Sequence, residues 1–171
     1  MSTPFDSQQD EHLRPAHPLD SVEDVLNGHN WTFRRVNPDE LVVQVTGKMG
    51  DYRIFFIWQD SLQALQFCAQ FDLHVKPYNI QAAHSALLTL NEHLWMGHFD
   101  LPKDTAMPTY RYTVLFRGLN HSTATETIED IVDISMAQCE RYFPVFSFLS
   151  GADLVNDQHL SLALMETAGE S

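Results

Sequence analysis

Basic side chains are scarce in this chain of 171 residues. It has 10 lysines and arginines against 23 aspartates and glutamates, which gives a formal net charge of −13. Arg34 and Arg35 form the only adjacent basic pair, and Arg141 is the only basic residue after Asn120. A surface of this charge repels a phosphate backbone, so we expect no nucleic-acid partner.

Cysteine is equally rare. Cys68 and Cys139 are the only two, they lie far apart, and each sits in an apolar pattern. We therefore expect two buried thiols in a reducing cytosol.

Long apolar runs are missing as well. No run approaches the roughly 20 residues that a membrane-spanning helix needs. Residues 1–20 also lack the apolar segment after a basic start that is typical of a secretory signal. We expect a soluble, cytoplasmic protein without a membrane partner.

The familiar motifs of nucleotide binding and hydrolysis do not occur. The sequence has no phosphate loop, no dinucleotide fingerprint and no nucleophile elbow, and neither cysteine precedes a protease signature. A serine triad stays open, because its members assemble from distant positions. We predict no cofactor, no catalytic residue and a protein that is not an enzyme.

The most informative stretch that is present is Asp51–Gln59. Tyr52, Ile54, Phe56 and Trp58 point to one side of an extended chain, and the other side is apolar at its middle. A strand of this kind belongs in the middle of a sheet, and we expect a further layer over each of its faces.

Other segments predict an α+β fold. Strand composition recurs at residues 31–36, 41–45 and 65–73. The connections between neighbouring strands are short turns, which indicates an antiparallel meander. A second hairpin is expected at 96–101 and 110–117. Helical spacing appears at 19–28, at 77–95 and from 122 to 149. The expected order is α-β-β-β-β-α-β-β-α, a meander packed against helices.

Helix boundaries can also be predicted from side-chain chemistry. Candidate N-caps are Asp20 or Ser21 for the first helix and Ser122, Thr123 or Thr125 for the longest one. Pro144 lacks a backbone N–H, so we expect a kink or a break there.

The chain divides into three parts. Residues 1–18 are rich in proline and glutamine and are expected to form a flexible arm. Residues 19–150 form a single domain, since a chain of this size can bury about 70% of its unfolded surface. Residues 151–171 form a C-terminal extension that either packs as a short helix or stays mobile.

Two groups of side chains are candidates for chemistry. His93 and His98 are five residues apart across a helix end, so they do not share one helix face as the ligands of helical zinc motifs do. Glu126, Glu129, Asp130 and Asp133 are explained by the polar face and the dipole of their helix. No metal site is assigned, and a metal-dependent hydrolase using His93 and His98 remains an alternative.

Partner-binding candidates are large aromatic and exposed apolar residues. Trp58, Tyr110 and Tyr112 suit an interface, unless the helices cover them. Leu154 begins a weakly patterned segment that leaves apolar area unsatisfied. A small-ligand pocket between sheet and helix is a further alternative.

Three segments together carry a family resemblance. They are Tyr52-Arg53-Ile54-Phe55-Phe56, the run 90–100 with Asn91 and Gly97-His98-Phe99, and Tyr110-Arg111-Tyr112-Thr113-Val114. With these segments the chain resembles the YbjN family over about residues 20–150. That family is described as bacterial sensory transduction regulators with a fold similar to type III secretion chaperones.

The resemblance implies a non-enzymatic regulator or chaperone-like adaptor. Such a protein would act through contacts with another protein and would be a homodimer. No catalytic residue comes with the resemblance, and the segment after Gly151 lies outside it.

Overall fold

The computed structural model describes residues 17–168 of the chain. Its elements follow the predicted α+β order, with two short 3-10 helices (η) and a last helix added. They are α1 Pro18–Gly28, β1 Phe33–Asn37, β2 Glu40–Thr46, β3 Asp51–Gln59, η1 Asp60–Leu62, β4 Ala64–Phe71, η2 Pro77–Asn79, α2 Ile80–Glu92, β5 His98–Asp100, β6 Thr109–Leu115, α3 His121–Ser150 and α4 Asp157–Ala168. Of the arm expected at 1–18, residues 1–16 lie outside the described part.

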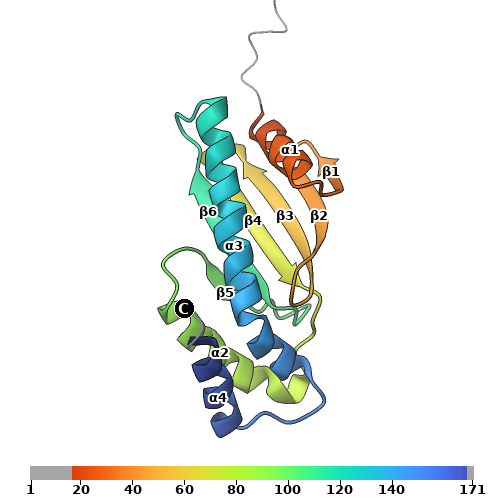
Figure 1. Cartoon of the computed structure of the whole chain (residues 1–171), viewed down its shortest axis with the longest axis vertical. Helices are drawn as coiled ribbons and strands as arrows, with labels where there is room; N and C mark the ends of the chain where they lie inside the picture. Colours follow the sequence, from red (N-terminus) through yellow and green to blue (C-terminus); the bar gives the residue numbers. More distant parts are fainter. Residues whose placement is uncertain (1–16, 169–171) are drawn as a thin grey trace, which may run out of the picture.

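Six strands form one sheet in the order β1-β2-β3-β4-β6-β5, and every neighbouring pair is antiparallel (Figure 1). Strands β1 to β4 are neighbours in sequence and in space, which confirms the predicted meander. Strand β3 pairs with β2 on one side and with β4 on the other. Asp51–Gln59 is therefore an interior strand, as its apolar pattern predicted.

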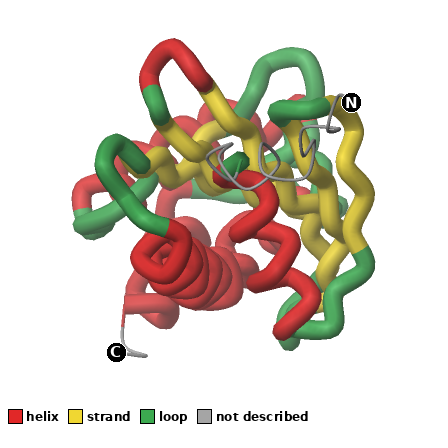
Figure 2. Tube along the Cα trace, turned by 90° about the horizontal axis from the view of Figure 1, so that it is seen from above, coloured by secondary structure: helices red, strands yellow, loops and turns green. Residues whose placement is uncertain are grey.

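Helices α1 and α3 cover one face of this sheet (Figure 1, Figure 2). The four β3 side chains that point toward them, Tyr52, Ile54, Phe56 and Trp58, are each 5% exposed or less. On the opposite face Phe55 and Ile57 are only half-buried and Arg53 is exposed. The predicted layer over the second face is therefore wrong for this strand.

Neighbouring strands explain why the second face stays open. Ile57 lies opposite Gln66 on β4 and Glu40 on β2, and Arg53 lies opposite Gln70, so polar side chains flank the apolar middle of this face. An antiparallel sheet with a mixed face of this kind can border water directly. The pattern of β3 alone did not contain this information.

Aromatic rings join α3 to the sheet. The Phe71 ring lies 5.8 Å from that of Phe143 and 5.2 Å from that of Phe146, both on α3. Phe99 on β5 lies 5.5 Å from Tyr142 and 5.2 Å from Phe146. Pairs with this spacing contribute about 0.5–1.5 kcal/mol each beyond the area that they bury.

The turn between β2 and β3 fits closely against α3. The carboxylate of Glu140 on α3 accepts a hydrogen bond of 2.9 Å from the backbone N–H of Met49. A Cβ atom at Gly47 would collide with that carboxylate, and one at Gly50 would collide with the Phe143 ring. Both positions therefore require glycine because of the close approach of the helix.

Both predicted N-caps are corrected by the structure. His17 caps α1, since its Nδ1 accepts a hydrogen bond of 3.1 Å from the N–H of Leu19, and Pro18 takes the first helical position that proline favours. Asn120 caps α3 by accepting a hydrogen bond of 3.0 Å from the N–H of Thr123.

Of the other two helices, α2 ends earlier than expected, whereas α3 agrees with the expected kink at Pro144 and the expected end at Gly151. Helix α2 ends at Glu92, and Trp95 is fully exposed instead of completing its apolar stripe. Helix α3 continues through Pro144 to Ser150, and Figure 1 shows its last turns leaning away from the axis of the first ones. Pro144 thus bends the helix without breaking it.

The close approach at Gly50 makes a specific prediction. Gly50→Ala should lower the free energy of unfolding by roughly 1–3 kcal/mol, because the Phe143 ring is stacked on Phe71 and has little room to move. Gly28→Ala is the matched control, since nothing lies within 4 Å of the added methyl group there. Urea unfolding of both variants measures the difference, and equal stability would contradict the packing described.

Candidate functional site

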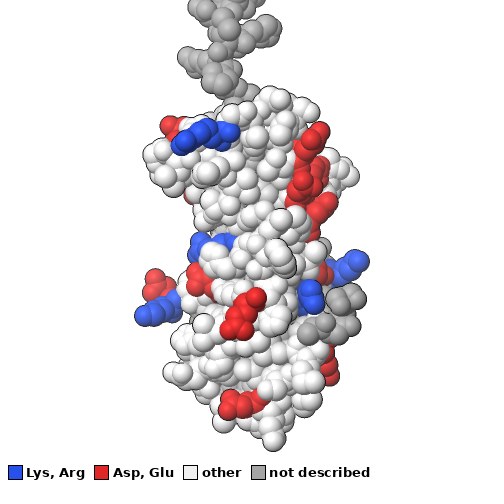
Figure 3. Space-filling model, turned by 90° about the vertical axis from the view of Figure 1, so that its left-hand side faces the viewer, with Lys and Arg blue, Asp and Glu red and all other residues white. Residues whose placement is uncertain are grey.

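A groove lies between the C-terminal part of α3 and helix α4. It has a volume of about 560 Å³, and its apolar lining includes Pro144, Phe148, Leu154 and Leu162. The end of the molecule where α2 and α4 lie is mostly uncharged in Figure 3. Five of its nine lining residues are apolar.

A buried asparagine fixes the segment between α3 and α4. The Asn79 side chain is fully buried, and its amide donates hydrogen bonds of 3.1 Å and 3.0 Å to the carbonyls of Leu149 and Asp153. Its oxygen accepts a bond of 2.9 Å from the N–H of Val155. Because Asn79 holds the backbone on both sides of Leu154, that side chain projects outward and is 68% exposed.

Helix α4 has two apolar faces. Leu160 is 5% exposed and packs into the core, whereas Leu162 is 59% and Met165 70% exposed. The far end of the helix is tied to α3, since Arg141 Nε donates a hydrogen bond of 3.2 Å to the carbonyl of Thr167. One face of α4 therefore holds the helix in place while the other leaves apolar side chains in contact with water.

The rim of the groove is acidic. Asp153 and Glu166 line it together with His159, and none of the described lining residues is lysine or arginine. The charge of the rim has the same sign as that of the whole chain.

The structure separates the predicted partner-binding residues. Trp58 is 5% exposed and Tyr110 is fully buried, so the folded chain offers neither side chain to a partner. Tyr110 donates a hydrogen bond of 2.7 Å to the carbonyl of Met96, and burial raises its pKa to about 12. Tyr112 is half-buried on β6. Of the four, only Leu154 lies in the groove.

His93 and His98 do not form a ligand set in the structure. His93 Nδ1 donates to the carbonyl of Thr89 at 2.7 Å, and His98 lies on β5 opposite Arg111. Within residues 17–168, the one group of three potential metal ligands contains neither histidine.

Both cysteines are buried. Cys139 on α3 is fully buried and Cys68 on β4 is 7% exposed. Burial is the main cause that raises the pKa of each thiol, and the effect is larger at Cys139. Since the thiolate is the reactive form, this environment is opposite to that of a catalytic cysteine.

The groove could not be found from sequence periodicity. The sequence identifies Leu154 as an unsatisfied apolar residue, but Phe148 lies off the apolar stripe of α3, and a single apolar residue at such a position is common on protein surfaces. Asn79, which positions the segment, carries no motif. A proline inside a long helix followed by a second apolar helix was the only available signal.

Within the described residues, no helix is both long enough and apolar enough to cross a membrane.

Comparison with known proteins gives a family and similar solved structures. The YbjN family, described as "Putative bacterial sensory transduction regulator", matches residues 18–148. A solved structure titled "Crystal structure of YbjN, a putative transcription regulator from E. coli" is 13% identical, with a TM-score of 0.47 over 73% of this chain and 93% of that one. None of the curated proteins searched matches the chain.

Because both thiols are buried, we predict slow alkylation of the cysteines in the folded state. We expect iodoacetamide at pH 8 to modify Cys139 at least about a hundredfold more slowly in the native protein than in urea, because modification must wait for opening of the core. Mass spectrometry of timed samples measures both cysteines separately. Modification of native Cys139 at the unfolded rate would contradict its placement.

Proposed function

The chain belongs to the YbjN family, and from this membership we propose that it is a non-enzymatic regulator that binds another protein in the groove between α3 and α4. A role in bacterial sensory transduction follows from the family description. Action as an adaptor or chaperone-like protein is a further part of the proposal.

One observation carries the proposal most directly. Phe148, Leu154 and Leu162 line the groove, are 36–68% exposed and come from three consecutive segments at one end of the molecule. Clustered apolar side chains with a polar rim are typical of interaction sites on soluble proteins. The segments are held by Asn79 and Arg141, so the surface exists before a partner binds.

The rim indicates the chemistry of the partner. Asp153 and Glu166 favour basic side chains, and the apolar floor favours leucine-like anchors. An amphipathic helix with lysine or arginine beside its apolar face would satisfy both. Two copies of this chain would bring two acidic rims together in the same groove. The homodimer implied by the family resemblance remains a separate prediction.

A small-ligand sensor is the second candidate. The volume of about 560 Å³ lies within the range of about 300–1,000 Å³ that ligand pockets occupy. A ligand screen by thermal shift tests this directly, and a hit abolished by Leu162→Asp would favour it over a protein partner.

Substitution of a groove leucine provides the central test of this function. A fluorescent 18-residue helical peptide of leucine and lysine serves as the probe, and a leucine–glutamate peptide of the same pattern serves as the charge control. We expect Leu162→Asp to weaken binding of the first peptide at least about tenfold, because it places a charge on the apolar floor. Fluorescence anisotropy gives the affinities.

The chain offers a closely matched control. Leu62, in η1 at the end of the β3–β4 hairpin, is 59% exposed, the same fraction as Leu162. Leu62→Asp should leave binding unchanged. Equal loss in both variants, or equal affinity for the two peptides, would contradict the proposal. A photo-crosslinking residue at position 162, but not at 62, should capture a basic amphipathic segment from a lysate.

A further inference from the structure

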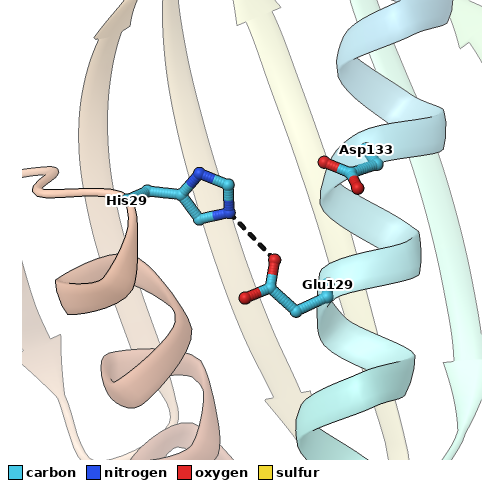
Figure 4. A group of neighbouring side chains, drawn as sticks. All are labelled: His29, Glu129 and Asp133. Carbon is cyan, nitrogen blue, oxygen red and sulfur yellow. Dashed lines mark hydrogen bonds and ion pairs between the residues drawn. The ribbon is translucent and has the colours of Figure 1, made fainter.

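Three potential metal ligands meet far from the groove, between α1 and α3. His29, Glu129 and Asp133 each offer one donor atom, and these atoms lie within 4.8 Å of one another. Figure 4 shows the imidazole and the two carboxylates turned toward the same space from the two helices. Sequence reasoning missed the group, because His29 is 100 residues away from Glu129.

The fold positions each donor for a local reason. His29 follows the last residue of α1, and its N–H donates a hydrogen bond of 3.1 Å to the carbonyl of Val25. Its ring is stacked on Trp31 with centroids 4.8 Å apart. Glu129 and Asp133 are four residues apart on α3 and therefore share one face of the helix. Packing fixes the imidazole in front of this pair.

The charge around the group favours a cation. Figure 3 shows acidic side chains aligned along the edge where the first half of α3 lies. Nε2 of His29 lies 2.9 Å from Oε2 of Glu129, but within residues 17–168 Asp133 has no ion pair. Like charges four residues apart on a helix destabilise it, and a shared cation would remove that repulsion.

We propose that His29, Glu129 and Asp133 bind a divalent transition-metal ion of the zinc class. One imidazole and two carboxylates are suitable ligands for such an ion, at bond lengths of about 2.0–2.2 Å, and a water completes a tetrahedron. Those bond lengths place the donors about 3.4 Å from one another. His29 Nε2 and Glu129 Oε2 are 2.9 Å apart, and none of the three donors is more than 4.8 Å from another, so small rotations of the partly or fully exposed carboxylates would reach this spacing.

The donor set also selects among ions. Mg²⁺ and Ca²⁺ prefer oxygen ligands and gain little from the imidazole. A bound transition metal would join the C-terminal end of α1 to the middle of α3, the pair of helices that covers the sheet. The ion would thus stabilise the described fold without any contact with the groove.

Titration of the full-length chain with Zn²⁺ and Co²⁺ tests the site. We expect one equivalent to bind, to raise the melting temperature, and to give the visible absorption of tetrahedral Co²⁺. Asp133→Asn and His29→Ala should each weaken binding by roughly tenfold or more. Loss of a residue that only hydrogen-bonds to a metal ligand already weakens metal binding about 10- to 100-fold, and loss of the ligand itself costs at least as much. Mg²⁺ should produce neither signal.

Asp130→Asn is the matched control, because it removes the same charge from an exposed position of the same helix outside the group. It should bind Zn²⁺ like the unsubstituted chain. The absence of binding at about 0.1 mM Zn²⁺, a concentration on the order of the dissociation constant of a weak protein site, would overturn the proposal. Unchanged binding by both His29→Ala and Asp133→Asn would also overturn it, since the ion would then lie at other histidines.

Discussion

The packing of α3 across one face of the sheet is the interaction on which the rest of the structure depends. Phe143 and Phe146 on the helix contact Phe71 on β4, and Phe146 also reaches Phe99 on β5. Strand β5 is three residues long and could not persist on backbone hydrogen bonds alone. The same helix carries Glu140, which shapes the turn between β2 and β3. One helix therefore holds both the short edge strand β5 and the turn between β2 and β3.

The length of α3 explains why a groove exists beside it. Its 30 residues span about 45 Å, whereas the eight residues of β4 span only about 26 Å. The helix therefore extends beyond the sheet, and Figure 1 shows its C-terminal turns next to α2 and α4. These two short helices pack on the protruding part but leave Phe148 and Leu162 partly uncovered. The candidate binding surface is thus a consequence of the mismatch in length.

The local elements could be predicted from sequence because their causes are local. The alternation in Asp51–Gln59 and the short turns beside it identified an interior strand and a meander. Exposure of the second sheet face could not be read from β3, because it depends on Gln66 and Gln70 of β4. Trp95 was assigned to a helix that ends three residues earlier. The groove and the His29 group depend on contacts between distant segments, to which no motif corresponds.

Native-state hydrogen exchange tests the central role of α3 most directly. If the helix and the sheet form one cooperative unit, amides in β3, in β4 and in residues 128–146 should exchange with the same opening free energy, equal to that of global unfolding. Amides of α4, which packs on the protruding part of α3 and on α2, should exchange at a lower free energy. Exchange of residues 128–146 at a clearly lower free energy than β3 and β4 would contradict this account.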